Sequence, residues 1–202
     1  MLSIIDAAGW PIWPLILCSV IAVAIIGERL WLLRNAVVCP PLLLNQVVKN
    51  YRQSGVTPQI LTQLTTHSPL GQIFAAGLRN EKHSAEVIKE SMTEAADNAA
   101  VELERFLNTL GTIASIAPLL GLFGTVVGMI EIFGSQSPQG ANPLALAHGI
   151  SVALYNTAFG LVVAVPSMVF YRYLRGRVDM LLFNMQQQAA KLIEIIHGNR
   201  SE

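Results

Sequence analysis

Charged residues are scarce in this sequence. Only 13% of its 202 residues are Asp, Glu, Lys or Arg, whereas 52% are hydrophobic; soluble domains usually carry about 25% charged residues. The 13 acidic residues balance the 13 Lys and Arg, so the chain lacks the basic surplus of a nucleic-acid-binding protein. These absences argue against an ordinary soluble domain and predict an integral membrane protein, in contact with the lipid bilayer and without a nucleic-acid partner.

Cysteine and catalytic motifs are also lacking. The two cysteines, Cys18 and Cys39, provide no disulfide framework, and we interpret both as free thiols. The chain contains no Gly-x-Ser-x-Gly, His-Glu-x-x-His, P-loop or Cys-x-x-Cys motif, and its four histidines are scattered without metal-ligand spacing. We therefore expect no enzymatic activity, no metal site and no cofactor.

What the chain does contain is three long apolar segments, at residues 12–33, 109–133 and 144–173. Each is long enough to cross a bilayer core, which needs about 20 apolar residues. The first is preceded by Asp6 and by no basic residue, the wrong charge for a cleaved signal peptide. We therefore expect an all-α integral membrane protein with three transmembrane helices.

The remaining segments fall on two sides of the membrane. If the chain crosses three times, every Lys and Arg lies on one side, which the positive-inside rule makes cytoplasmic. We expect a periplasmic N-terminus at 1–11, a cytoplasmic helical domain at 34–108, a periplasmic loop at 134–143 and a cytoplasmic C-terminal helix at 174–202.

Helix-start signals occur within the expected cytoplasmic domain. Thr57-Pro58 and Ser68-Pro69 each match an N-cap followed by proline at the first helical position. Ser84 precedes a longer stretch in which small and apolar residues recur at threes and fours. No breaker separates this stretch from residue 109, so we expect one helix that runs without interruption into the second span.

The second and third spans carry small and polar residues at helical spacing. Small residues let membrane helices pack closely, and hydroxyl groups either bond their own backbone or line a wet path. We expect close packing at Gly121, Gly124, Gly128, Gly149 and Gly160, and kinks at Pro118 and Pro166. Helix packing and lining of a proton path remain open alternatives for Thr125, Thr157, Ser151 and Asn156.

Ionisable residues in the spans lie near the ends. An ionisable side chain in a membrane is a functional candidate, and Glu131 and His148 are secondary candidates of this kind. For Glu28 and Arg29, at the inner end of the first span, we expect solvation at the membrane interface. The middle of the second and third spans contains no carboxylate, so a proton-carrying acid must come from a partner helix.

Two stretches resemble a known family. Residues 117–129 read Ala-Pro-Leu-Leu-Gly-Leu-Phe-Gly-Thr-Val-Val-Gly-Met, and residues 149–161 read Gly-Ile-Ser-Val-Ala-Leu-Tyr-Asn-Thr-Ala-Phe-Gly-Leu, followed by Val165-Pro166. Together with the three-span layout, they are similar to the ExbB/TolQ/MotA proton-channel family, and most similar to its ExbB branch.

The resemblance implies a multi-pass subunit of a motor in the bacterial inner membrane. Five copies would surround a pair of single-span helices, ExbD-like or TolR-like, whose membrane Asp carries the proton and whose motion energises a TonB-like protein. The pore-side threonines of the family match Thr125 and Thr157. A TolQ-like role in envelope maintenance and a non-conducting scaffold for a partner remain alternatives.

One position departs from the ExbB and TolQ pattern. Val152 occupies the place of a glutamate that those two branches commonly have and that the MotA branch lacks. The substitution removes the cost of desolvating a carboxylate in the membrane core. We therefore expect the titrating acid on the partner and not on this chain.

Overall fold

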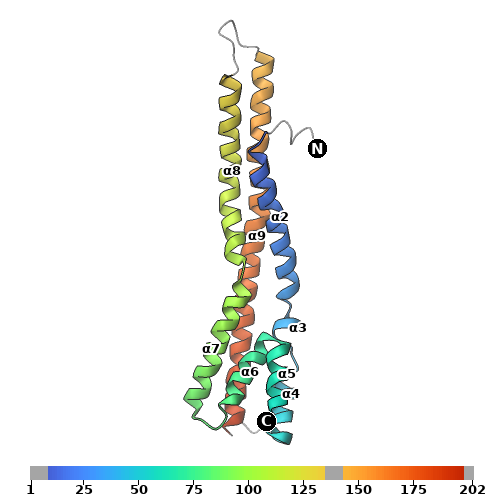
Figure 1. Cartoon of the computed structure of the whole chain (residues 1–202), viewed down its shortest axis with the longest axis vertical. Coiled ribbons are helices and arrows are strands. Elements are labelled where there is room, and N and C mark those ends of the chain that lie inside the picture. Colours follow the sequence, from blue (N-terminus) through green and yellow to red (C-terminus); the bar gives the residue numbers. More distant parts are fainter. Residues whose placement is uncertain (1–8, 135–142, 198–202) are drawn as a thin grey trace. The chain divides into compact units, whose positions relative to one another are not determined.

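The computed structural model describes residues 9–134 and 143–197 (Figure 1). Its described part is helical throughout and contains no strand. The helices are α2 (Ile12–Leu32), α3 (Asn35–Val38), α4 (Leu43–Ser54), α5 (Pro58–His67), α6 (Pro69–Arg79), α7 (Ala85–Glu104), α8 (Leu107–Gly134) and α9 (Pro143–Ile196).

Three apolar stretches of the described helices are long enough to cross a membrane. They lie in Ile12–Leu32, Ala85–Gly134 and Gly149–Ile196. Exposed large apolar side chains are frequent along them, as a lipid-facing surface requires. The expected all-α membrane fold with three spanning helices is confirmed.

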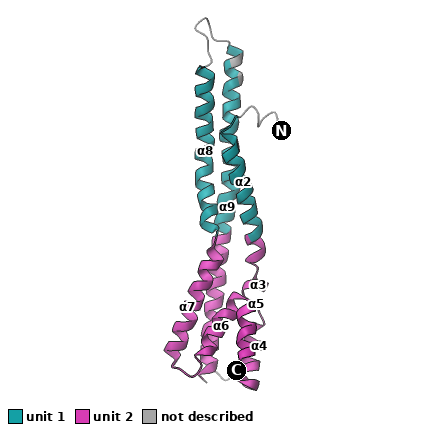
Figure 2. Cartoon of the chain, viewed as in Figure 1, with its two compact units in different colours: residues 1–28, 106–173 teal, residues 29–105, 174–202 magenta. Residues whose placement is uncertain are grey.

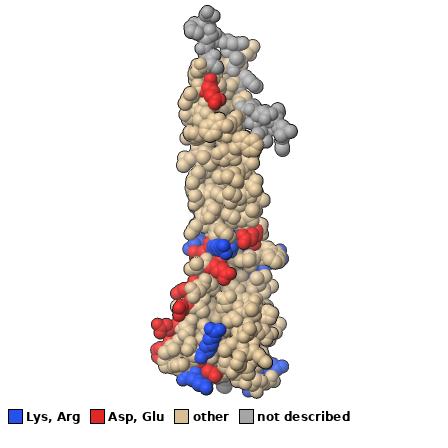
Figure 3. Space-filling model, in the orientation of Figure 1, with Lys and Arg blue, Asp and Glu red and all other residues tan. Residues whose placement is uncertain are grey.

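The chain divides into two compact units (Figure 2). Unit 1 comprises residues 1–28 and 106–173, and unit 2 comprises residues 29–105 and 174–202. On the face seen in Figure 3, charged side chains gather over the helices of unit 2, and the surface of unit 1 is nearly free of them. Unit 1 therefore has the composition of a membrane-embedded body, and unit 2 that of a solvated one.

The two predicted N-caps that precede a proline are confirmed. Thr57 begins α5, and its Oγ1 accepts a hydrogen bond from the Ile60 backbone N–H at 3.4 Å. Ser68 begins α6, and its Oγ accepts from the Gly71 backbone N–H at 3.1 Å. Each hydroxyl satisfies a backbone donor of the first helical turn, which lacks an acceptor within the helix.

The expected uninterrupted helix from residue 84 into the second span is wrong. Helix α7 ends at Glu104 and α8 begins at Leu107. Between them Phe106 has a φ of 62°, the one positive φ at a non-glycine residue in the described part of the chain. Residues 85–110 contain no proline or glycine, so the sequence gives no local signal for this interruption.

The third span and the C-terminal helix, which we expected as two segments, form the single helix α9 of 54 residues. Both α8 and α9 continue through their internal prolines, Pro118 and Pro166. The expected loop at 134–143 lies almost wholly outside the described residues, as do most of the expected N-terminus and the last five residues.

Candidate functional site

Helices α8 and α9 lie side by side in unit 1 with their backbones in contact (Figure 1). A Cβ atom on Gly121 would lie 2.7 Å from the Asn156 carbonyl oxygen, and one on Gly160 would lie 2.6 Å from the Ala117 carbonyl oxygen. Real Cβ atoms do not approach backbone so closely, so only glycine permits this packing. The contact extends along both helices, at Gly124, Gly128 and Gly149.

This close packing brings two of the sequence-predicted residues together. The hydroxyls of Thr125 on α8 and Thr157 on α9 form a hydrogen bond with each other. The Thr125 hydroxyl also lies 3.1 Å from the Gly121 carbonyl oxygen and 3.3 Å from that of Ala153. The Thr157 hydroxyl lies 3.3 Å from the Gly121 carbonyl oxygen. Two hydroxyls and two backbone carbonyls therefore form one polar cluster, which we call the threonine pair. The side chains of Thr125 and Thr157 are both half-buried.

The hydrogen-bond distances of the threonine pair allow two donor orders. Each hydroxyl has one proton to donate and two lone pairs to accept with. In one order Thr157 donates to Thr125, which donates to the Ala153 carbonyl; in the other, Thr125 donates to Thr157, which donates to the Gly121 carbonyl. The pair can thus reverse its hydrogen bonds without moving a helix. In both orders the outer acceptor is a backbone carbonyl, and a threonine hydroxyl does not titrate near neutral pH, so the pair as described holds its own two protons.

The other two predicted lining residues lie elsewhere. Asn156 is 1% exposed and packs against α8, where a Cβ on Gly124 would lie 2.8 Å from its Cγ atom. Ser151 is exposed and donates to the Ala147 carbonyl of its own helix at 3.0 Å. The structure therefore joins Thr125 and Thr157 and separates both from Ser151.

Carboxylates are almost absent from α8 and from the first part of α9. Glu131 is the sole acidic residue of α8, and α9 has none before Asp179. Glu131 is exposed near the end of α8, and the side chain of His148 lies outside the described part. Val152 is partly exposed and supplies no titratable group. The described threonine pair consequently has no acid of its own chain beside it.

Arg29 is the residue whose position the sequence did not predict. The expected solvation at the membrane interface is wrong, because this side chain is only 2% exposed. Its guanidinium donates to the backbone carbonyls of Glu102 and Leu103, each at 3.3 Å. Backbone acceptors far along the chain leave no signature in sequence spacing, so only the fold reveals this contact.

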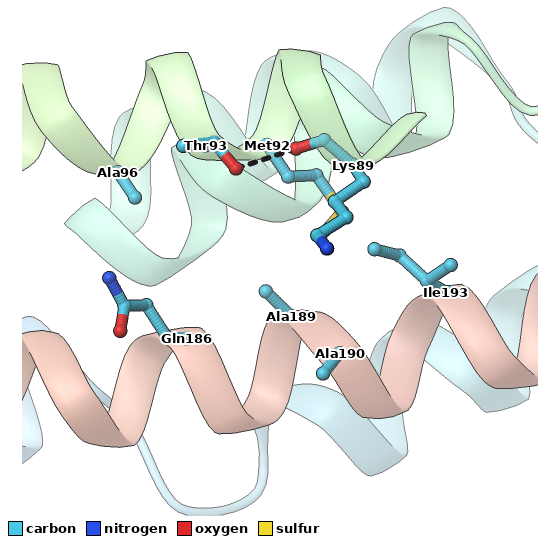
Figure 4. A pocket seen from close by; sticks show the side chains of 8 residues that line it. All are labelled: Lys89, Met92, Thr93, Ala96, Gln186, Ala189, Ala190 and Ile193. Atoms are coloured by element: carbon cyan, nitrogen blue, oxygen red, sulfur yellow. Dashed lines mark hydrogen bonds between the residues drawn. The ribbon is translucent and has the colours of Figure 1, made fainter. Parts of the chain in front are cut away.

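Unit 2 contains a hollow lined by residues of two helices. The hollow, of about 440 Å³, lies between α7 and α9 and is lined mainly by apolar side chains (Figure 4). The Thr93 hydroxyl at its edge already donates to the Lys89 carbonyl at 2.8 Å. The described residues include no group of His, Cys, Asp and Glu that could hold a metal ion.

The buried thiol of Cys39 in unit 2 does not have the properties of a reactive nucleophile. Cys39 is 7% exposed, and its Sγ lies 3.0 Å from Nε2 of Gln188. Burial raises the pKa of the Cys39 thiol, an effect that the Gln188 hydrogen bond only partly opposes. A raised pKa keeps the thiol protonated and unreactive at neutral pH.

The sequence of this chain is similar to a protein family and to several of its members. Residues 65–187 match the model of the MotA/TolQ/ExbB proton channel family. The chain is 31% identical over 196 residues to the putative biopolymer transport protein ExbB-like 3 of Synechocystis sp., a match that covers 95% of this chain and 92% of that one.

Two further relatives represent different branches. Biopolymer transport protein exbB1 of Vibrio cholerae is 32% identical over 169 residues, which cover 79% of this chain and 72% of the relative. The Tol-Pal system protein TolQ of Pseudomonas aeruginosa is 32% identical over 161 residues, which cover 74% of this chain and 67% of the relative. The residues matched by the family model, 65–187, include Thr125 and Thr157.

Proposed function

Because the chain belongs to the MotA/TolQ/ExbB proton channel family, we propose that it forms the channel wall of a proton-driven motor in the bacterial inner membrane. The family is one of multi-pass membrane proteins of the ExbB and TolQ type, which work with ExbD-type or TolR-type partners, and it is not a known enzyme family.

The observation that carries the proposal is the threonine pair. Its hydroxyls lie in the apolar parts of α8 and α9, bonded to each other and to two backbone carbonyls. In a relay, a neighbouring acid would donate to one hydroxyl, that hydroxyl would donate to the other, and the second hydroxyl would donate to a receiving group in place of a backbone carbonyl. Since α8 and the spanning part of α9 lack a central acid, the group that binds and releases the proton must belong to another polypeptide.

We propose that this other polypeptide is a single-span, ExbD-like protein with an Asp in its membrane helix. Several copies of the present chain, five by analogy with the family, would surround it. The Asp would accept a proton from one side, pass the threonine pair and release the proton to the other side. The resulting motion would energise a TonB-like protein, in keeping with the biopolymer-transport names of the ExbB relatives.

The proposed topology places residues 1–11 and 134–143 in the periplasm, and 34–108 and 174–202 in the cytoplasm. It rests on the distribution of Lys and Arg, all of which fall on one side of the three spans. Residues 12–33, 109–133 and 144–173 would be the membrane helices. Almost nothing then protrudes into the periplasm, so any periplasmic contact must be made by the partner.

Removal of the chain from the bacterium that produces it separates the TonB-type from the TolQ-type role. We expect loss of energised uptake through outer-membrane receptors, measured with a radiolabelled iron chelate, and normal resistance to detergent. Re-expression should restore uptake. Detergent sensitivity and leakage of periplasmic protein with normal uptake would instead assign the TolQ-like role, for which the TolQ similarity is the supporting observation.

A further inference from the structure

The part of α9 that belongs to unit 2 has an exposed face with coiled-coil spacing. Five exposed positions recur at alternating intervals of four and three residues, and we call them the α9 seam: Gly176, Met180, Phe183, Gln187 and Ala190. Helices that wind around one another present side chains at this alternating spacing. A Cβ added to Gly176 would have nothing within 4 Å, so no described part of the chain covers that end of the seam.

Two large apolar side chains of the seam are exposed. Phe183 is 58% exposed and Met180 is 53% exposed, and both belong to unit 2, over which the charged side chains gather (Figure 3). The opposite face of the same helix is buried, at Leu181, Met185 and Leu192, so the seam is not the core side of α9. In a solvated body, an exposed apolar face is typical of a surface that another chain covers.

Helix α7 makes one side of the seam acidic. Ala190 of the seam lines the hollow between α7 and α9, together with Lys89 and Thr93 (Figure 4). Lys89 and Thr93 also line a second hollow, whose other lining residues are the exposed acids Glu86, Glu90, Glu94 and Asp97. Lys89 is the one basic residue of α7, so negative charge dominates on this side.

The other side of the seam is basic. Gln187 of the seam lines a hollow of about 320 Å³ together with Asn35 of α3 and Asn45 of α4, so these helices flank the seam opposite α7. Helices α3 and α4 contain no acidic residue. The acid beside them, Glu81, is half-buried and hydrogen-bonded to Tyr51. The basic side chains of α4 and of the part of α9 that faces α3 and α4 are Lys49, Arg52, Arg177 and Lys191.

The opposite charges of the two sides indicate which chain covers the seam. A copy of this chain, packed seam against seam in parallel, places the acidic side of each copy against the basic side of the other. An antiparallel copy would bring like charges together. We propose that the α9 seam binds a second copy of this chain in the parallel orientation, with Phe183 and Met180 buried between the copies. That several copies gather rests on the proposed function; which faces meet does not.

Glu90 and Lys191 form the charge pair that the proposal predicts between copies. Glu90 follows Lys89, and Lys191 lies two residues before Ile193; since Lys89 and Ile193 line the same hollow (Figure 4), the two charges lie at similar heights along α9. Within one chain they lie on different sides of the seam. Parallel copies related by rotation meet at equal heights, so Glu90 of one copy lies opposite Lys191 of the next.

Photo-crosslinking of the full chain in intact cells identifies what covers the seam. Benzoylphenylalanine replaces Phe183, and Ala190 in a second variant, which serves if the first is not produced. We expect a product of twice the chain mass, with peptide fragments of this chain alone. As a matched control the same residue replaces the exposed Asn98, which lies nine residues, or two and a half turns, from Lys89 and therefore on the opposite side of α7. The control should give at least tenfold less product.

Charge reversal tests the parallel orientation. Lys191→Glu and Glu90→Lys should each lower the yield of cross-linked dimer at least threefold, because each places like charges opposite one another between copies. Both changes in one chain should restore the yield. Lys82→Glu reverses an exposed charge in the turn after α6 and should leave the yield unchanged.

Three results would overturn the seam contact: a product with another protein or with lipid, no product from either seam position in an assembled complex, or equal product at Asn98. Unchanged yield in both single charge variants, or no recovery in the double variant, would refute the parallel orientation. Cross-linking needs no proton gradient. A chain that forms the dimer product but does not support transport would therefore contradict the proposed function alone, so the two claims fail separately.

Discussion

Replacing Thr125 and Thr157 together by valine is expected to reduce proton-driven transport at least tenfold while the complex still assembles. Valine has the shape of threonine and lacks the hydroxyl, so the reversible hydrogen-bond chain disappears. The Gly121 and Ala153 carbonyls that accept from these hydroxyls belong to helices, and they keep their backbone hydrogen bonds. Net hydrogen-bond contributions of about 1 kcal/mol each are partly offset by the added apolar surface.

Two controls make the threonine experiment decisive. Serine at both positions retains both hydroxyls and should retain most transport. Thr112→Val removes an exposed hydroxyl that bonds only the Asn108 carbonyl of its own helix, at 2.8 Å, and should leave transport unchanged. Transport is measured as uptake driven by an imposed pH gradient in vesicles. Normal uptake in the double valine variant would reduce the threonine pair to a packing contact.

Gly160→Ala is expected to destabilise the protein strongly. The new Cβ would lie 2.6 Å from the Ala117 carbonyl oxygen and 3.1 Å from the Gly121 Cα atom. Both are backbone atoms, so no side chain can rotate away and α8 must separate from α9. Overpacking typically lowers the free energy of unfolding by about 1–3 kcal/mol. Because the clash here is with backbone atoms, we expect a loss at or above the upper end of that range. Thermal unfolding in detergent should show a markedly lower Tm.

The chain offers graded controls for this prediction. Gly176, also in α9, has nothing within 4 Å of an added Cβ, so Gly176→Ala should be neutral or stabilising by up to about 1 kcal/mol from helix propensity. Gly124→Ala should fall in between, because its Cβ would meet side-chain atoms of Asn156 at 2.8 Å. Equal Tm values for Gly160→Ala and Gly176→Ala would contradict the close backbone packing.

The membrane helices and two of the caps could be predicted from the sequence because their causes are local. Long apolar runs select the spans, and Thr57 and Ser68 precede prolines that start helices. The interruption at Phe106 could not be predicted in this way. Local rules favoured a continuous helix there. Near the interruption, the guanidinium of Arg29, more than 70 residues away in the chain, donates to the backbone carbonyls of Glu102 and Leu103, a contact that sequence spacing does not reveal.

The threonine pair was predictable in part. Helical spacing placed Thr125 near Gly121 and Gly128, and Thr157 near Gly160, while the family resemblance named both threonines. That the two hydroxyls meet each other follows from the register of α8 against α9, which glycine contacts set. Spacing within one helix cannot reveal that register. For the same reason the separation of Ser151 from the pair became visible only in the structure.

The central claim is that this chain provides a hydroxyl-bearing wall while the titrating acid belongs to a partner helix. Proton flux into liposomes tests it most directly, with the purified chain alone, with a single-span partner that has a membrane Asp, and with the same partner carrying Asn. We predict flux only in the second preparation. Flux through the chain alone would contradict the claim, and so would equal flux with the Asp and Asn partners.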